Sequence, residues 1–229
     1  MSEEEKVNSV HALKYVEKID SFKSERWCDG CWLLKHFCIC SEVPVIAPLN
    51  PIRFHLYVHY KEYKRTSNTG ILIKKLLPNS GVYISCHDSD KTNLFTEISE
   101  NPNICVLYPG DTSLTLESWL ETCTPSEKNF ILLDSTWNQG RKLMRTLPKS
   151  LKRVKIVSDA QSLIKCKKQS NQGYFSTLEC AALILKQMGD IAAYEEIMKT
   201  FVLKDKAALK QTNKFSLLKK LEESEHYAV

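Results

Sequence analysis

One stretch decides the fold of this chain: Phe130-Ile-Leu-Leu-Asp134-Ser-Thr-Trp137-Asn-Gln-Gly-Arg141. Four apolar residues in a row are typical of a buried strand, and this strand ends on a carboxylate. Small hydroxyl residues follow, and an amphipathic pattern then predicts a helix over residues 137–147. In open α/β sheets, ligands bind beyond the carboxyl ends of strands, beside helix N-termini. The stretch therefore predicts a strand–helix unit with Asp134 at a binding edge.

The rest of the body alternates between strand and helix patterns. Strand-like runs lie at residues 52–59, 82–86, 104–108, 130–134 and 154–157, and helical patterns lie at residues 69–77, 114–122, 137–147 and 177–188. This alternation predicts an α/β fold, with a mostly parallel sheet and helices on both faces.

Four parts are expected along the chain. An N-terminal extension (1–24), with a short helix over residues 11–19, precedes a cysteine-rich segment (25–45). The α/β body (46–200) follows, and a lysine-rich helical tail (201–229) ends the chain.

The composition is that of an ordinary globular protein. With 229 residues, of which 43% are hydrophobic, one compact domain with small appendages is expected. A net charge of +5 is compatible with nucleic-acid binding but does not establish it. The chain starts with polar residues, and no run approaches the roughly 18 apolar residues of a membrane helix. Because nine cysteines make an unlikely disulfide framework, we expect a soluble intracellular protein, cytoplasmic or nuclear, with reduced or metal-bound thiols.

A cluster of four cysteines predicts a metal site. The residues are Cys28, Cys31, Cys38 and Cys40, spaced as C-x2-C-x6-C-x-C. Two such close pairs can complete the tetrahedral shell of one zinc ion, and His36 between them could replace one thiolate. The alternative is a set of ordinary buried or reactive thiols. Four protein ligands leave no open coordination position, so the predicted zinc would be structural.

The residues after the central strand have a purely structural alternative. Asp, Ser and Thr are favoured helix N-caps, so Asp134, Ser135 and Thr136 could simply start the helix. Trp137 could be a core anchor in its first turn. Together with Arg141 one helical turn later, however, these residues indicate something narrower.

This combination resembles the signature of the DTW-domain family, which is Asp, any residue, Thr, Trp. Four further elements of that family occur in the family's order. They are the cysteine cluster, the stretch from His59-x-x-Glu62-x-x-Arg65 into Asn68-Thr69-Gly70, the turn Tyr108-Pro109-Gly110, and the helix start Ser176-Thr177-Leu178-Glu179. The resemblance covers most of the chain between residues 28 and 185.

The resemblance implies a SPOUT-like fold with a C-terminal knot, preceded by a small zinc knuckle. It also implies an S-adenosylmethionine-dependent enzyme that modifies RNA. Such enzymes transfer the 3-amino-3-carboxypropyl group to N3 of a uridine, typically in tRNA, and release methylthioadenosine. No membrane partner is implied, and the sequence does not say whether the chain pairs with itself.

The same resemblance implies roles for individual residues. Asp134 would accept the N3 proton, although aspartate is ordinarily a weak base and could instead orient the uracil ring. The cofactor would contact Tyr108, Pro109, Gly110, Ser135, Thr136, Trp137, Ser176 and Thr177. The RNA would contact Arg65, Asn68, Thr69, Arg141, Lys165 and Lys167. The structural alternative for Ser176 and Thr177 is an N-capping segment.

The chain departs from the family pattern at three places. Ser135 stands where Gly or Ala is expected, and Gly140 stands where Ala is usual. Lysines of the segment 162–168 replace a Tyr-Arg-x-Arg-like element, and lysine cannot make the forked contacts of arginine. RNA binding or the choice of target could therefore differ from the family's. Two other functions also stay open: a methyltransferase with the same site, since SPOUT-like proteins commonly transfer methyl, and a non-catalytic zinc-containing RNA-binding protein.

Overall fold

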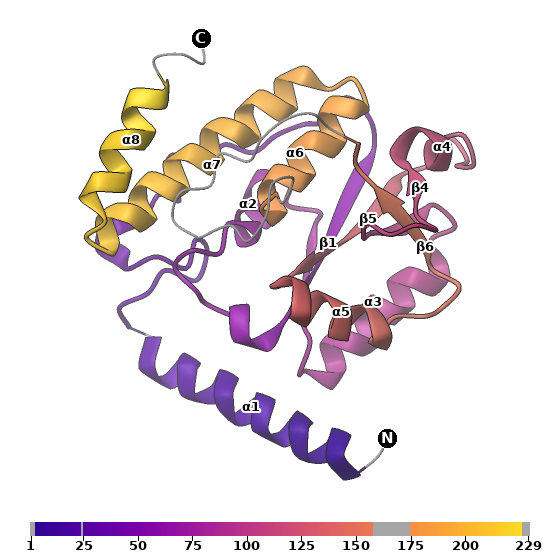
Figure 1. Ribbon diagram of the computed structural model, residues 1–229, viewed down its shortest axis with the longest axis horizontal. Coiled ribbons are helices and arrows are strands. Elements are labelled where there is room, and N and C mark those ends of the chain that lie inside the picture. Colours follow the sequence, from indigo (N-terminus) through magenta and orange to yellow (C-terminus); the bar gives the residue numbers. More distant parts are fainter. Residues whose placement is uncertain (1–2, 24, 158–174, 226–229) are drawn as a thin grey trace. The chain divides into compact units, whose positions relative to one another are not determined.

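The computed structural model describes residues 3–23, 25–157 and 175–225 (Figure 1). The chain divides into two compact units. The first comprises Met1–Glu25, Pro48–Lys64 and Asn79–Val157, and the second comprises Arg26–Ala47, Arg65–Pro78 and Ser158–Val229.

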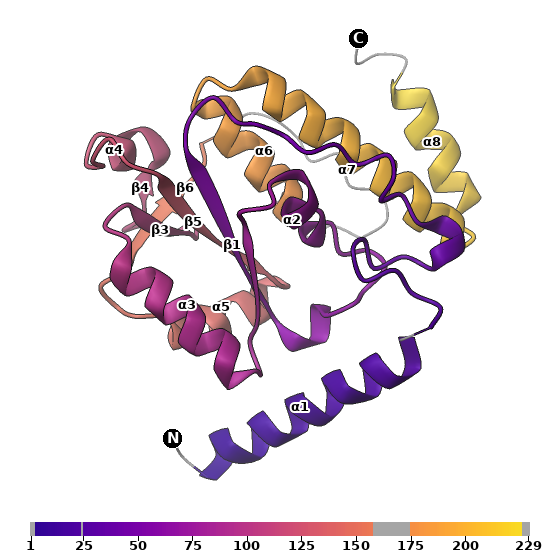
Figure 2. The ribbon, with the colours of Figure 1, turned by 180° about the vertical axis from the view of Figure 1, so that it is seen from behind.

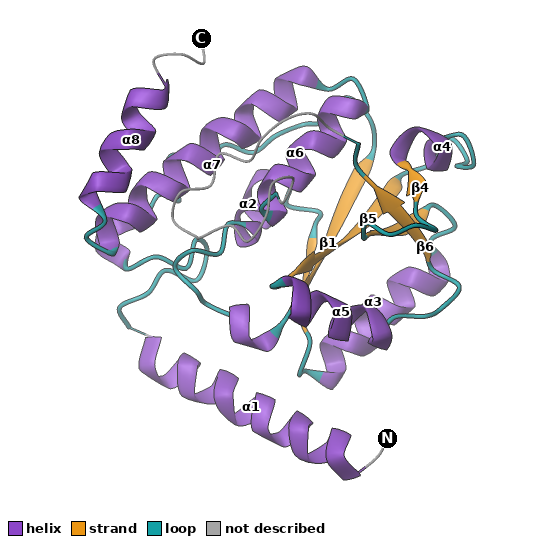
Figure 3. Cartoon of the chain, in the orientation of Figure 1, coloured by secondary structure: helices purple, strands orange, loops and turns teal. Residues whose placement is uncertain are grey.

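The first unit holds a sheet in which six strands are described, drawn in orange in Figure 3. They are β1 (Ile52–Val58), β2 (Gly81–Ile84), β3 (Ile104–Leu107), β4 (Leu114–Thr115), β5 (Lys128–Asp134) and β6 (Lys152–Lys155), in the order β2-β1-β5-β3-β6-β4. Every pairing is parallel, which confirms the prediction of a parallel sheet. The predicted stretch 130–134 forms most of β5, which lies between β1 and β3.

The helices belong to both units. The first unit contains α1 (Glu3–Lys23), the 3₁₀ turn η2 (Tyr60–Glu62), α3 (Asp88–Glu100), α4 (Leu116–Leu120) and α5 (Trp137–Thr146). The second unit contains η1 (Lys35–Phe37), η3 (Gly70–Leu72), α2 (Ile73–Leu76), α6 (Thr177–Gln187), α7 (Ile191–Gln211) and α8 (Phe215–Glu225). No described helix has both the length and the apolar character needed to span a membrane.

Helices α3 and α5 pack side by side on one face of the sheet (Figures 1 and 2). Leu94 of α3 and Leu143 of α5 join Val106 and Ile131 of the strands in one buried cluster. Burial of one such side chain contributes roughly 1.5–3 kcal/mol, so this layer holds α5 and its first turn against the sheet.

The other face of the sheet carries large aromatic side chains, because successive residues of a strand point to opposite faces. Phe130 is fully buried, with its ring centroid 5.9 Å from that of Phe54 and 5.0 Å from that of Trp119 in α4.

Several local expectations were wrong. Helix α3 was not expected, because its sequence is polar and its one buried residue is Leu94. The stretch 114–122 was expected to be a helix throughout, but its first two residues pair as β4. The stretch 69–77 divides into η3 and α2, and α1 is much longer than the expected helix over residues 11–19.

The C-terminal knot stays a prediction, since residues 158–174 lie outside the described residues. The four-part division of the chain also stays a prediction, and α7 runs without interruption through residue 201.

Candidate functional site

The carboxyl edge of the sheet places Asp134 beside the end of β1. Asp134 is the last residue of β5, is 4% exposed, and pairs in register with Val58. The backbone amide of His59 donates to the Asp134 carbonyl oxygen at 3.0 Å. The backbones of His59 and Asp134 are therefore locked together at the edge where open α/β sheets bind ligands.

Helix α5 starts after Asp134, with Thr136 as its N-cap. The Gln139 side chain accepts a hydrogen bond from the Thr136 amide at 2.8 Å, and the Gly140 amide donates to the Thr136 carbonyl at 2.7 Å. The structural alternative is thus correct for Thr136. It is wrong for Asp134, which belongs to the strand.

Trp137 is 39% exposed, so its interpretation as a core anchor was wrong. Its ring centroid lies 6.3 Å from that of Tyr108, with the two planes inclined at 56°. The Tyr108 amide donates to Val154 at 2.9 Å, and the Ser113 hydroxyl donates to the Tyr108 carbonyl at 2.7 Å. The rings of Tyr108 and Trp137 therefore lie together at the carboxyl edge. Hydrogen bonds to its amide and its carbonyl hold the backbone of Tyr108 in place.

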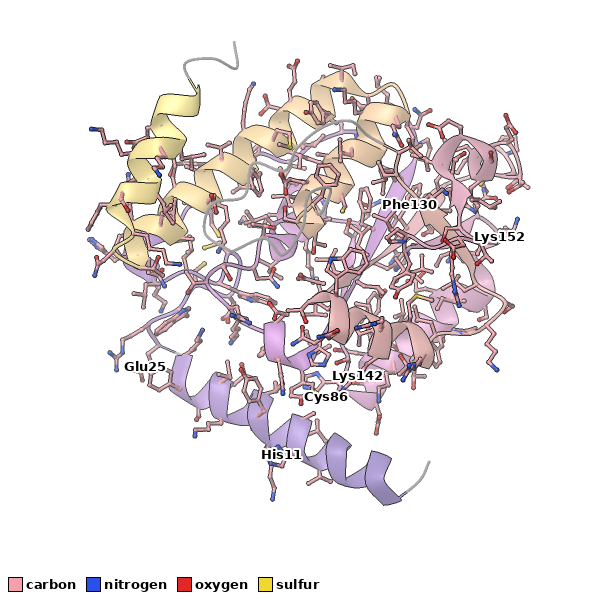
Figure 4. The ribbon with its side chains drawn as sticks, viewed as in Figure 1. His11, Glu25, Cys86, Phe130, Lys142 and Lys152 are labelled. Atoms are coloured by element: carbon pink, nitrogen blue, oxygen red, sulfur yellow. The ribbon has the colours of Figure 1, made fainter. Side chains whose placement is uncertain are left out.

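His59 and Glu62 follow β1 and are both buried, with 7% and 1% of their surfaces exposed. Burial lowers the pKa of His59 to about 4; the charge of Glu62 opposes this shift, and the charges of Lys61 and Lys142 reinforce it. Lys142 is labelled on α5 in Figure 4. His59 was noted in the sequence as part of a motif but was not assigned to the site. Its position directly after a buried strand was the feature that could have indicated a site residue.

Helix α1 fixes the loop that carries these residues. Asp20 accepts a hydrogen bond from the Tyr63 hydroxyl at 2.9 Å and pairs with the Lys64 ammonium at 2.8 Å. The rings of Tyr15 and Tyr60 meet edge to face, with centroids 5.6 Å apart. The expected N-terminal extension is thus packed against the segment that follows His59.

The four cysteines form a group that could hold a metal ion. Their sulfur atoms all lie within 4.8 Å of one another, with 3.5 Å between Cys28 and Cys40 and 3.8 Å between Cys31 and Cys38. Four sulfur atoms about 2.3 Å from a tetrahedral zinc ion lie about 3.8 Å apart, so the group fits this ion. His36 is not a member of the group.

Gly30 leaves room for the cysteine group. A Cβ atom at this position would lie 2.9 Å from the Cys40 sulfur and 3.8 Å from the Cys28 sulfur. Only glycine fits the turn between the first two cysteines without displacing a sulfur atom.

Helix α7 supports the cysteine segment. Lys204 is fully buried and donates from its ammonium to the Cys31 carbonyl. The Gln211 side chain accepts from the Leu34 amide at 2.8 Å and donates to the Thr66 hydroxyl at 3.0 Å. One side chain of α7 thereby joins the cysteine segment to the stretch that contains Asn68 and Thr69.

The motif residues of the second unit have clear structural roles. Asn68 is fully buried and accepts from the Ile71 amide at 3.2 Å, and Thr69 is the buried N-cap of η3. Ser176 caps α6: its amide donates to Glu179 at 2.7 Å, and its hydroxyl accepts from the Glu179 amide at 3.3 Å. The capping interpretation of Ser176 is therefore confirmed.

The predicted site residues fall in three groups. The first unit contains Tyr108, Pro109, Gly110, Asp134, Ser135, Thr136, Trp137 and Arg141, and the second contains the four cysteines, Arg65, Asn68, Thr69, Ser176 and Thr177. Lys165 and Lys167 lie outside the described residues. Arg65 and Arg141 are exposed, and the Arg141 guanidinium donates to Asn138.

Known proteins are similar to the chain over most of its length. The model of the DTW domain matches residues 25–208. A tRNA-uridine aminocarboxypropyltransferase 2 of Mus musculus is 28% identical over 165 residues, and that of Macaca fascicularis is 24% identical over 174 residues. A third, of Drosophila melanogaster, is 25% identical over 166 residues.

The matched segments make up 69%, 73% and 69% of this chain. They cover only 55%, 58% and 64% of those relatives, so the chain matches between about half and just under two thirds of each. No solved structure matches the chain significantly. The domain match spans far more than half of the 229 residues, and the chain therefore belongs to the DTW domain family.

Proposed function

We propose that this chain transfers the 3-amino-3-carboxypropyl group of S-adenosylmethionine to N3 of a uridine in tRNA. One observation carries the proposal: a buried carboxylate, Asp134, ends the central strand of a DTW domain at the edge where ligands bind. The relatives at 24–28% identity are tRNA-uridine aminocarboxypropyltransferases, which supports the same reaction class. Such an enzyme would work where tRNA is found, in the cytoplasm or the nucleus.

Asp134 is the proposed catalytic base. Uridine N3 carries a proton and is a poor nucleophile until that proton leaves, and a carboxylate held against N3 can accept it. S-adenosylmethionine supplies an electrophilic carbon next to its sulfonium. As N3 bonds to that carbon, the carbon–sulfur bond breaks, its electron pair stays on sulfur, and neutral methylthioadenosine leaves.

The pair formed by the exposed Trp137 and the partly buried Tyr108 offers flat aromatic surface at the same edge, suited to stacking on a nucleobase. We assign cofactor contacts to this pair and to Pro109, Gly110, Ser135, Thr136, Ser176 and Thr177. RNA contacts are assigned to Arg65, Asn68, Thr69, Arg141, Lys165 and Lys167. The burial of Asn68 and Thr69 favours a role in shaping the backbone of their loop for these two residues.

The proposed zinc ion would be held by Cys28, Cys31, Cys38 and Cys40. With four thiolates the coordination shell is full, so these residues would stabilise the knuckle and take no part in the transfer. Their connection to α7 through Lys204 is consistent with a structural role.

The proposal is tested by incubating the purified protein with S-adenosylmethionine and bulk tRNA, followed by mass spectrometry of the nucleosides. Aminocarboxypropyl-uridine together with methylthioadenosine is the expected result. A methylated nucleoside together with adenosylhomocysteine would instead establish a methyltransferase. RNA binding without any cofactor affinity would establish a non-catalytic RNA-binding protein.

A further inference from the structure

His59 is the one buried imidazole at the carboxyl edge of the described sheet. It follows the last residue of β1, and its amide donates to the Asp134 carbonyl at 3.0 Å. Adjacent parallel strands end together at this edge, so His59 and Asp134 are direct neighbours at the candidate site.

The contacts of the ring fix its tautomer and its plane. The Lys61 amide donates to Nδ1 at 3.2 Å, so Nδ1 carries no proton and the neutral ring has its proton on Nε2. The Tyr60 ring stacks on the imidazole, with centroids 4.6 Å apart and planes inclined at 28°. The structure shows no hydrogen bond between Nε2 and any described residue, although more than nine-tenths of His59 is buried. Nε2 is not one of the fully buried polar atoms that lack a partner, so this donor is accessible at the carboxyl edge and a ligand there can accept its hydrogen bond.

The ring is neutral at physiological pH. Burial lowers its pKa to about 4; the nearby Glu62 favours the charged form, while Lys61 and Lys142 disfavour it. A neutral ring can donate a hydrogen bond from Nε2 without adding a positive charge beside the proposed base.

We propose that His59 is a second catalytic residue, which donates a hydrogen bond from Nε2 to a carbonyl oxygen of the uracil ring. This inference rests on the proposed function. Loss of the N3 proton leaves a negative charge that is shared between N3 and the two flanking carbonyl oxygens. A fixed donor at one of these oxygens stabilises that charge, and removal of such a donor typically costs about 10²–10³-fold in rate. Asp134 takes the proton, and His59 transfers none.

Two isosteric substitutions separate the proposed donor role of Nε2 from the structural role of Nδ1, which accepts from the Lys61 amide. In His59→Asn the amide oxygen occupies the place of Nδ1 and can still accept from Lys61, but no donor stands at the place of Nε2. In His59→Gln the amide nitrogen occupies the place of Nε2. We expect the single-turnover rate at neutral pH to fall about 10²-fold in His59→Asn and to recover partly in His59→Gln.

The pH profile supplies the decisive readout. At alkaline pH the uridine loses its N3 proton more readily. The difference in single-turnover rate between the wild-type protein and His59→Asn should therefore shrink steadily as the pH rises. If His59→Asn is slower than the wild-type protein by the same factor at every pH, or if His59→Asn and His59→Gln have equal rates, the proposal is overturned.

The wild-type protein provides the controls. If it forms no aminocarboxypropyl-uridine, the proposed function itself fails; if it does and His59→Asn is equally fast, only the role of His59 fails. Should the variants not fold, ¹⁵N spectra of wild-type histidines give an independent test with tRNA and adenosylhomocysteine. A protonated Nε2 whose signal shifts when tRNA binds supports the proposal, and an unchanged signal contradicts it.

Discussion

A Cβ atom on Gly140 would lie 3.0 Å from the hydroxyl oxygen of Ser135, closer than such atoms normally approach. Gly140 is buried in α5, one turn after the residue that caps it. These are two of the positions at which the chain departs from the family pattern, with a larger residue than expected at 135 and a smaller one at 140. The two departures therefore compensate each other across the start of α5.

This compensation predicts a measurable coupling. In the Ser135→Ala background, Gly140→Ala should stabilise the protein by about 0.5–1 kcal/mol, because alanine is the better helix former. In the wild-type background the gain should be smaller or reversed. Urea unfolding of the wild-type protein, the two single variants and the double variant measures the difference in stability. Additive effects of the two substitutions would show that the contact between residues 135 and 140 is unimportant.

The role of Asp134 predicts a defect in turnover without a defect in folding. Asp134→Asn keeps the shape of the side chain but cannot accept the N3 proton, so the transfer rate should fall by about 10²–10⁴-fold. Thermal unfolding and cofactor binding serve as controls. A folded variant with a nearly normal rate would remove Asp134 from the chemistry.

The cysteine group predicts one zinc ion per chain. Cys40→Ser should lose most of the bound metal, whereas Cys123→Ser, outside the group, should keep it. Gly30→Ala should weaken metal binding as well, since its Cβ would lie 2.9 Å from the Cys40 sulfur. Metal analysis of the purified variants, before and after treatment with a chelator, checks all three expectations.

The buried histidines predict a loss of stability in mild acid. Burial lowers the pKa of His55 and of His59, the latter from 6.5 to about 4. The unfolded chain binds protons more readily, so the stability from the neutral rings is present above pH 6.5 and is lost as the pH falls towards 4.

For His59 the loss amounts to roughly 3 kcal/mol at most, from about 1.4 kcal/mol per pKa unit. Urea unfolding at a series of pH values gives the curve, which should flatten in His59→Asn. A wild-type stability that does not change over this range would contradict the assignment of a buried neutral ring.

Local patterns in the sequence were sufficient for the central strand, the capped helix after it and the grouping of the four cysteines. Each depends on neighbours along the chain: an apolar run ending at Asp134, a hydroxyl residue before Trp137, and close pairs of thiols. The parallel sheet followed from the alternation of strands and helices.

Only the tertiary structure revealed α3, the short strand β4 and the state of His59. The polar sequence of α3 shows little periodicity because only Leu94 is buried. β4 exists because two residues pair with a strand distant in sequence. His59 is neutral because burial lowers its pKa to about 4, and its position beside Asp134 comes from the pairing of β1 with β5. The sequence by itself thus determined which residues form the carboxyl edge of the sheet. Burial and strand pairing decided which residues meet at that edge and in what charge state, because both depend on contacts between segments that are distant in the sequence.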